Sequence, residues 1–168
     1  MTALKDIDYK ILYELMRNAK KSDRQLAKEI GVSQPTLTRR RTRLEQDVIK
    51  GYTIIPNWLK LGYSLFGITL VKVNPTARTQ KRREAVSEKA VEWLKEHPNI
   101  IMGGGCTGDR ADSFMISVHK DYADYDNLIA ELRMHLGDIV SDIQSHLVNL
   151  KGKTVLKPLD LQCLADVK

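Results

Sequence analysis

Residues 22–45 read SDRQLAKEIGVSQPTLTRRRTRLE, and this stretch decides the fold of the first third of the chain. Ser22, followed three positions later by Gln25, forms a capping box, which predicts that a helix begins here. Gly31 predicts where that helix ends, because glycine takes a left-handed backbone conformation at little cost. Ser33 can then cap a second helix that runs to about residue 45. Two helices joined by so short a turn indicate a helix-turn-helix.

The two helices have complementary apolar faces. Leu26 and Ala27 of the first helix and Leu37 and Leu44 of the second fall at inward positions, and Ala27 is small enough for the helices to cross there. In a helix-turn-helix the second helix lies in the major groove of DNA, with its N-terminal part at the base edges. The side chains predicted to contact DNA are Ser33, Gln34, Thr36, Thr38, Arg39, Arg40, Thr42 and Arg43.

These side chains suit DNA recognition by their chemistry. Gln and Arg offer paired donors and acceptors that match adenine and guanine, and Thr hydroxyls reach bases or phosphates. The arginines add attraction to the phosphate backbone. The other interpretation is a solvated basic helix on a helical bundle. The coincidence of the capping box, the small residue at the crossing, the glycine and the positive charge favours DNA binding.

The net charge is concentrated in the same region. Residues 1–56 carry 12 Lys and Arg against 7 Asp and Glu, whereas residues 57–168 carry 15 against 14. This asymmetry is typical of a module that binds a polyanion joined to a nearly neutral one. A basic surface without a partner would have the same charge, so charge alone leaves both interpretations open.

Two more elements complete the predicted first domain, residues 1–56. Apolar residues at helical spacing predict a helix at Asp6–Asn18. Residues Ile49–Pro56 are typical of a short strand or hairpin, which would make the domain a winged helix-turn-helix. Residues 57–62, punctuated by proline and glycine, predict a linker.

After residue 62 the apolar pattern alternates between strand and helix. The predicted elements are a strand at Tyr63–Asn74, a helix with Val86, Ala90, Trp93 and Leu94 on one side, strands at Asn99–Cys106 and Ser113–His119, a helix at Tyr122–Leu136 and a strand at Ile139–Leu150. This β-α-β-β-α-β order predicts a ferredoxin-like domain over residues 63–152, with an extended tail at 153–168, and an α+β protein as a whole. Two helices would cover one sheet face, and the other, partly apolar face needs a partner.

Composition excludes several other classes. No apolar run is long enough to span a membrane, and the first residues lack the shape of a signal peptide. The two cysteines and four histidines show neither a disulfide framework nor metal-ligand spacing. No Lys-Ser/Thr pair follows Gly103–Gly105, so this run predicts a distorted strand that a neighbouring subunit or a ligand approaches closely, not a phosphate-binding loop. We therefore expect a cytoplasmic protein without a cofactor or a metal.

Several motifs, taken together, resemble the Lrp/AsnC family of transcription regulators, most of all its archaeal members. They are LKDIDYKIL at 4–12, QLAKEIGVS at 25–33, Arg40, Leu44-Glu45, VIKGY at 48–52, LGY at 61–63, TGD at 107–109 and MISVHK at 115–120. Each motif is modest alone, but in this order they extend over nearly the whole chain. The resemblance implies a winged helix-turn-helix followed by the family's RAM-type αβ sandwich.

The resemblance also implies partners. Members bind double-stranded DNA and pair through the open sheet face into dimers, which build tetramers or octamers. Many bind an amino acid or a related metabolite near a Gly-Asp turn, which here contains Thr107, Gly108, Asp109 and Asp112.

The chain departs from the family pattern at three places. Asp47 replaces a usual glycine, and the turn from Gly108 to Asp112 is longer than usual. Arg41 replaces a usual Ile or Val, which predicts a second helix that is more basic and less buried on one flank.

Two other functions fit the same two-domain plan. Siroheme decarboxylases resemble Lrp/AsnC proteins but carry a His-Asn-Tyr-x-Arg stretch, and no His-Asn pair occurs in this sequence. A protein that compacts DNA with little sequence preference would use the triple arginine, whereas Gln34, Thr36 and Thr38 favour reading of bases. We therefore predict a sequence-specific DNA-binding regulator, not an enzyme.

Overall fold

The structure, a computed structural model, describes residues 3–75, 80–152 and 155, with the backbone alone at 80–87. The chain forms two compact units, one containing Met1–Ile55 and the other Pro56–Leu156. Apart from Val155, the predicted tail at 153–168 lies outside the described residues. No helix among the described residues is long and apolar enough to cross a membrane.

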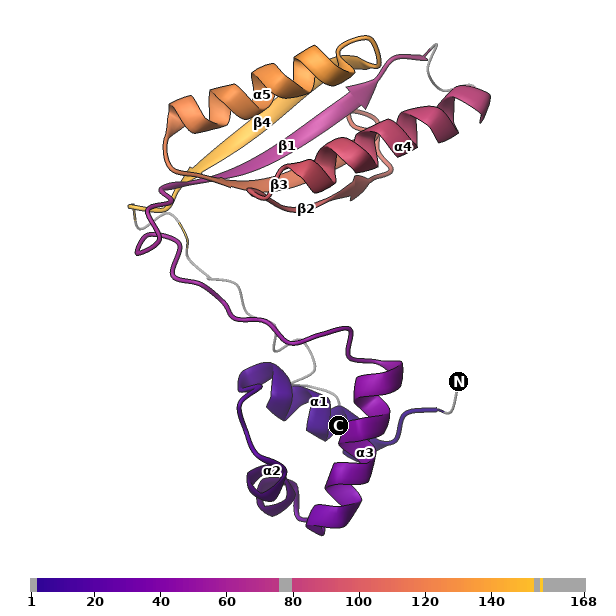
Figure 1. Cartoon of the computed structure of the whole chain (residues 1–168), viewed down its shortest axis with the longest axis vertical. Helices are drawn as coiled ribbons and strands as arrows, with labels where there is room; N and C mark the ends of the chain where they lie inside the picture. The colour runs from indigo at the N-terminus through magenta and orange to yellow at the C-terminus, as the bar shows by residue number, and fades with distance from the viewer. Residues whose placement is uncertain (1–2, 76–79, 153–154, 156–168) are drawn as a thin grey trace. The chain divides into compact units, whose positions relative to one another are not determined.

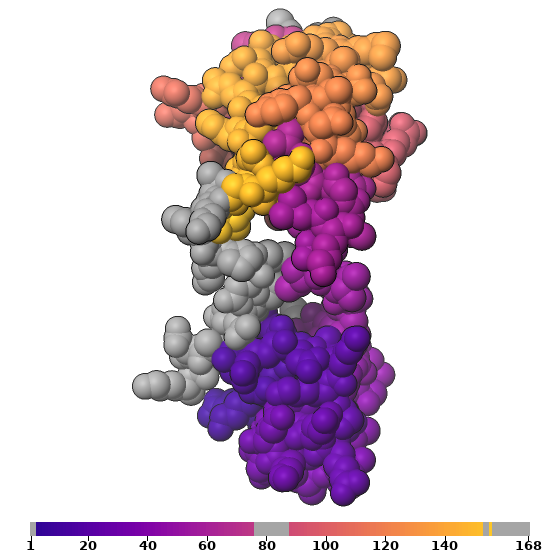
Figure 2. Space-filling view, turned by 90° about the vertical axis from the view of Figure 1, so that its left-hand side faces the viewer, coloured from indigo at the N-terminus to yellow at the C-terminus, as the bar shows by residue number. Residues whose placement is uncertain are grey.

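The first unit contains three helices, α1 at Asp6–Arg17, α2 at Asp23–Ile30 and α3 at Gln34–Asp47 (Figure 1). Their fully or nearly buried apolar side chains form one core, which comprises Ile11, Leu15, Leu26, Ala27, Leu37 and Leu44. The predicted inward faces are confirmed, because the apolar positions at helical spacing are the ones removed from water. In the space-filling view the three helices, coloured indigo to purple, pack into one continuous body (Figure 2).

The turn between α2 and α3 forms largely as predicted. The Ser22 hydroxyl accepts a hydrogen bond from the Gln25 amide, and the Gln25 side chain accepts one from the Ser22 amide, which completes the capping box. Gly31 ends α2 with φ of 81°, in the left-handed region that favours glycine. Ser33 is the N-cap of α3 by its backbone, but its hydroxyl donates to Thr36 Oγ1 (2.8 Å) and caps no amide.

The predicted wing does not form. The stretch Ile49–Pro56 is described in full and contains no strand or hairpin. Ile49 packs against the helical core, whereas Ile54 and Ile55 are 76% and 55% exposed. A strand needs a second backbone for its hydrogen bonds, and an isolated two-stranded hairpin is at best marginally stable. Among the described residues this segment pairs with no second backbone, and Ile54 and Ile55 stay exposed.

The second unit is an α+β domain with a four-stranded antiparallel sheet. Its elements are β1 at Leu65–Val73, α4 at Gln80–Glu96, β2 at Ile100–Gly105, β3 at Ser113–His119, α5 at Tyr122–Leu136 and β4 at Val140–Asn149. The strand order β2-β3-β1-β4 confirms the predicted ferredoxin-like topology. Residues 58–62, at the end of the predicted linker, form a turn before β1, with Gly62 at φ of 89°.

The two faces of this sheet differ. Helices α4 and α5 cover one face (Figure 1) and bury a core that includes Trp93, Met115 and Leu132. On β1 the alternate residues point to the opposite face, where Ile68 is 40% exposed. We define the open face by the outward apolar residues that the strand register places together, which are Phe66, Ile68, Leu70, Phe114, Ile116 and Val148.

Candidate nucleic-acid interface

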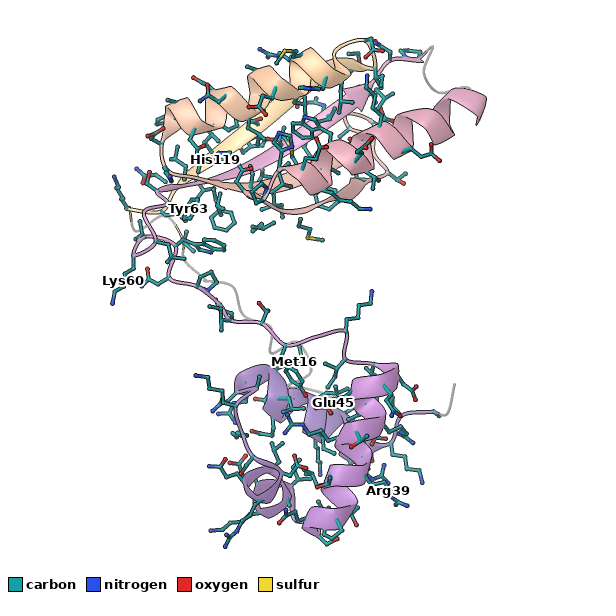
Figure 3. All side chains as sticks on the ribbon, viewed as in Figure 1. Met16, Arg39, Glu45, Lys60, Tyr63 and His119 are labelled. Atoms are coloured by element: carbon teal, nitrogen blue, oxygen red, sulfur yellow. The ribbon has the colours of Figure 1, made fainter. Side chains whose placement is uncertain are left out.

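The outer surface of α3 presents polar side chains that the rest of the unit leaves available. Gln34 and Arg39 are exposed, and neither side chain makes a hydrogen bond or ion pair within the described part of the chain. Arg39 extends from α3 away from α1 and α2 (Figure 3). A glutamine and an arginine with free donors and acceptors can each form two hydrogen bonds to a base edge.

Two of the arginines predicted to contact DNA turn inward to a buried carboxylate. Asp8 on α1 is fully buried, and its two oxygens accept hydrogen bonds from Arg40 Nη1 (2.9 Å) and Arg43 Nη2 (2.8 Å). The Lys5 amide donates a third bond to the same carboxylate (2.8 Å). The side chains of Arg40 and Arg43 are 19% and 34% exposed. This cluster therefore ties α3 to the start of α1.

The hydrogen bonds decide the ionisation of Asp8. Burial alone would raise the pKa of this carboxyl, because a low-dielectric environment disfavours the charge. The bond from the Lys5 amide, the bond from Arg40 and the positive charges of Arg40 and Arg43 outweigh burial and hold the pKa below the ordinary value of 3.8. Asp8 is therefore ionised at neutral pH, and its negative charge offsets part of the positive charge of α3.

Arg41 is the centre of a second cluster, which we call the Arg41 cluster: Asp23, Arg41, Glu45 and Tyr52. The guanidinium donates to Asp23 Oδ1 (3.0 Å), Glu45 Oε1 (2.9 Å) and Tyr52 Oη (3.3 Å). Tyr52 in turn donates to Glu45 (2.7 Å), and burial together with this carboxylate raises the pKa of the phenol. The flank of α3 at Arg41 is partly buried: the side chain is 19% exposed and pairs with two carboxylates.

Of the four hydroxyl groups predicted to contact DNA, on α3 and its N-cap, three donate their proton to a partner within the fold. Thr38 Oγ1 donates to Asp23 Oδ2 (2.6 Å), and Thr42 Oγ1 donates to the Thr38 carbonyl (3.0 Å). The Ser33 hydroxyl donates to Thr36, as described above. Thr38 and Thr42 nevertheless remain exposed, one helical turn apart.

The turn predicted to bind an effector lies between β2 and β3. Thr107, Gly108 and Asp109 are exposed, and the backbone carbonyl of Asp109 accepts a hydrogen bond from Lys72. Asp112 is partly buried, and its carboxylate accepts a bond from the Val73 amide (2.9 Å). The structure therefore gives Asp112 a role in holding this turn against β1.

The glycine run before this turn has an internal explanation at one position. A Cβ atom on Gly103 would lie 3.1 Å from Leu94 of α4, which is tighter than ordinary contact. A Cβ on Gly104 or Gly105 would meet nothing closer than 3.8 Å. At Gly103 the close neighbour is thus a helix of the same domain, and the approach of a neighbouring subunit or a ligand to this run stays a prediction.

Sequence reasoning missed Asp8, Asp23 and Tyr52 as members of this site. For Asp8 a signal was present: it falls three residues before Ile11 and seven before Leu15, on the buried stripe of α1. A carboxylate on a buried stripe needs partners. Tyr52 carried no comparable signal, because no local pattern places it beside α3.

The histidines and acidic residues give no sign of a metal site in the described part of the chain, where no three of them lie close enough to hold an ion. His119 is fully buried and bonds Ser117 Oγ (2.7 Å), and burial lowers its pKa despite the nearby carboxylate of Asp124. His97 bonds the Trp93 carbonyl and Glu131. Both rings are engaged within the fold.

The first unit matches a known domain family, and most of the chain is similar to known transcriptional regulators. Residues 4–45 match the AsnC-type helix-turn-helix domain. The transcriptional regulator Ptr1 of Methanocaldococcus jannaschii is 31% identical over 126 residues, which cover 74% of this chain and 78% of Ptr1. The transcriptional regulator AzlB of Bacillus subtilis is 28% identical over 94% of this chain and 96% of AzlB.

Solved structures share the fold over most of their length. A Neisseria meningitidis transcriptional regulator, crystallised as its L-Met complex, superposes with a TM-score of 0.76 at 20% identity, over 94% of this chain and 98% of that one. Escherichia coli AsnC gives 0.70 at 20% identity, over 87% and 92%. The sequence motifs, the helix-turn-helix and these relatives agree: the chain belongs to the Lrp/AsnC family of DNA-binding transcriptional regulators.

Proposed function

We propose that this regulator reads operator DNA as a homodimer or a larger assembly, with the outer surface of α3 at the base edges. The proposal rests on the fact that the polar side chains of α3 fall into two groups, those that pair within the fold and those that stay available. Arg40 and Arg43 bind Asp8, and Arg41 pairs with Asp23 and Glu45, whereas the side chains of Gln34 and Arg39 have no partner among the described residues. We would not expect this separation into paired and available side chains in a helix that served only as a solvated basic surface.

The proposed contacts follow this division. Gln34 and Arg39 read base edges, with Thr38 and Thr42 beside them, and Ser33 and Thr36 lie at the leading end of the helix. Arg43 keeps enough exposure to attract a phosphate, whereas Arg40 chiefly positions α3 through Asp8. We propose binding without catalysis, in the cytoplasm; His97 and His119, which an enzyme could use, take internal hydrogen bonds.

Replacing Arg39 and Arg43 one at a time tests these roles. We expect Arg39→Ala to cost about 1–3 kcal/mol at one base position and to relax preference there. Arg43→Ala is expected to weaken binding to all duplexes alike and to reduce the salt dependence by about one contact. Titrations of a selected site and its single-base variants at several salt concentrations measure both. If the two variants lose affinity uniformly across sequences, Arg39 does not read a base.

Dimerisation through the open face would supply two recognition helices related by a two-fold axis. The face carries apolar residues of β1 and β3 together with Val148 of β4, and Ile68 at its centre is 40% exposed. On β4 the register also places His146 beside Ile68 and Gln144 beside Leu70. In a two-fold dimer the open face of one chain would pack against the open face of a second copy. The same dimer would bring two segments Ile49–Pro56 into one assembly, with a second backbone available to each.

The turn at Thr107–Asp112 is the proposed effector site, with an amino acid or a related metabolite as the ligand. The similar Neisseria meningitidis regulator was crystallised with L-Met. In this chain Asp109 is exposed, so its carboxylate can pair with an ammonium group, and Arg110 is exposed beside it. Such a ligand regulates only if it binds one assembly state better than another.

Screening the amino acids by thermal shift and light scattering tests this proposal. We expect at least one of them to raise the melting temperature and change the assembly size, and Asp109→Ala to abolish both responses. Asp138→Ala removes another exposed carboxylate of the same domain and serves as the control. If no amino acid changes either quantity, this domain assembles the protein without sensing amino acids.

A further inference from the structure

We infer that Asp23 fixes the hydrogen-bonding polarity of Thr38, so that Thr38 recognises a DNA base only as an acceptor. The inference rests on the proposed function, in which the outer surface of α3 faces base edges. It makes Thr38 a specificity-determining residue that reads exocyclic amino groups, and it makes Asp23 the positioning residue that decides this.

The donor in the Thr38–Asp23 contact is determined by chemistry. The two oxygens lie 2.6 Å apart, and an ionised carboxylate can only accept a hydrogen bond. The single hydroxyl proton of Thr38 therefore points to Asp23, while its lone pairs remain available on an exposed side chain. A short bond to a charged oxygen is about twice as strong as a neutral one, so a base edge does not readily displace it.

The Asp23 carboxylate is held from its other side. Its Oδ1 atom accepts from Arg41 Nη1 (3.0 Å), so one oxygen binds Arg41 and the other binds Thr38. Glu45 and Tyr52 hold the guanidinium in turn. Thr42 makes a useful contrast, because its hydroxyl donates only to the neutral Thr38 carbonyl at 3.0 Å and can exchange this bond more easily.

An acceptor-only hydroxyl restricts what Thr38 can recognise. In the major groove the donors are the N6 amino group of adenine and the N4 amino group of cytosine, whereas guanine O6 and N7 and thymine O4 are acceptors. Phosphate oxygens are acceptors too, so Thr38 is excluded from the backbone contacts that threonines often make. Thr38 therefore contributes to base preference and not to general affinity.

The test begins with sites selected from random duplexes by the full chain. Thr38→Val, which removes the hydroxyl at nearly constant size, identifies the base position that Thr38 contacts. At that position the amino-bearing base is replaced by an analogue without the amino group, purine for adenine or 2-pyrimidinone for cytosine. We expect the wild type to lose about tenfold more affinity than Thr38→Val on this replacement. Equal losses for the two proteins overturn the inference.

Asp23→Ala tests the role of the carboxylate. It frees the Thr38 proton to donate, so we expect acceptor-bearing bases to be tolerated at that one position, with about tenfold less discrimination there and unchanged discrimination elsewhere. Glu29→Ala is the matched control, because it removes another exposed carboxylate of α2, one that pairs with Lys21, and leaves Asp23 and its partners in place. Unchanged discrimination in a folded Asp23→Ala protein contradicts the inference.

The analogue experiment decides the question alone if Asp23→Ala fails to fold, since Thr38 lies on the surface. Failure of the inference is distinguishable from failure of the proposed function. A wild-type protein that selects no consensus overturns both. A clear consensus with an amino group that matters equally to wild type and Thr38→Val overturns the inference alone.

Discussion

Asp8→Ala is expected to destabilise the helix-turn-helix unit by about 3 kcal/mol, which is a large part of the stability of so small a unit. The change removes the shared partner of Arg40 and Arg43, and it leaves the Arg40 side chain, 19% exposed, without a carboxylate. Two charged groups would then have to move into water, and α1 would lose its polar attachment to α3.

The unfolding of the two units can be followed with different spectroscopic signals. Both tryptophans, Trp58 and Trp93, lie in the second unit, so their fluorescence follows that unit alone, whereas circular dichroism follows the helices of both. In urea we expect Asp8→Ala to show an early loss of helicity with an unchanged fluorescence transition. Asp6→Ala, at an exposed position in the same helical turn, is the control and should change little. Coincident wild-type and Asp8→Ala curves would show that the buried ion pairs contribute nothing.

The same carboxylate predicts a pH dependence. Because the folded-state pKa of Asp8 lies below the ordinary 3.8, its contribution is present at neutral pH and is lost as the pH falls through the ordinary value towards the folded one. Lowering the pH should therefore reduce the difference in the free energy of unfolding between wild type and Asp8→Ala.

Ile68→Asp has the largest expected effect on assembly. In a two-fold dimer the substitution buries two carboxylates among the apolar residues of β1 and β3, where a charge is costly. We expect the dimer dissociation constant to rise about 1000-fold, which corresponds to about 4 kcal/mol. Operator affinity should fall with it, because two linked DNA-binding units bind more tightly than one.

Sedimentation equilibrium of the full chain measures this effect. Met134→Asp is the control, because Met134 is 74% exposed on α5, away from the open face. Circular dichroism checks that Ile68→Asp still folds, as expected for a position that is already 40% exposed in one chain. A folded Ile68→Asp protein that remains a dimer would exclude the open face as the interface.

Local patterns predicted the five helices and the four strands of the sheet closely. The Ser22 capping box and Gly31 mark the boundaries of α2, and the alternation along β1 separates a covered face from an open one. These features depend on residues a few positions apart, which is the range over which periodicity and capping act. The ferredoxin-like order followed from the sequence of elements alone.

The roles of the arginines could not be predicted in the same way. Asp8 and Arg40 are 32 positions apart, and Arg41 and Asp23 are 18 apart, so their pairing depends on how the three helices pack. Arginines next to one another on one helix turn to different partners for this reason. The expected wing failed because a strand depends on another backbone, which no pattern within Ile49–Pro56 reveals.

The most direct measurement is selection of bound sites from random duplex DNA by the full chain. A dimer that presents two α3 helices predicts an enriched consensus of two inverted half-sites, with centres about 10 base pairs, one helical turn, or a multiple of it, apart. Adding Arg39→Ala to the same selection should relax one position in each half-site. An unenriched pool, or a consensus without dyad symmetry, would contradict a dimeric regulator that reads DNA with α3.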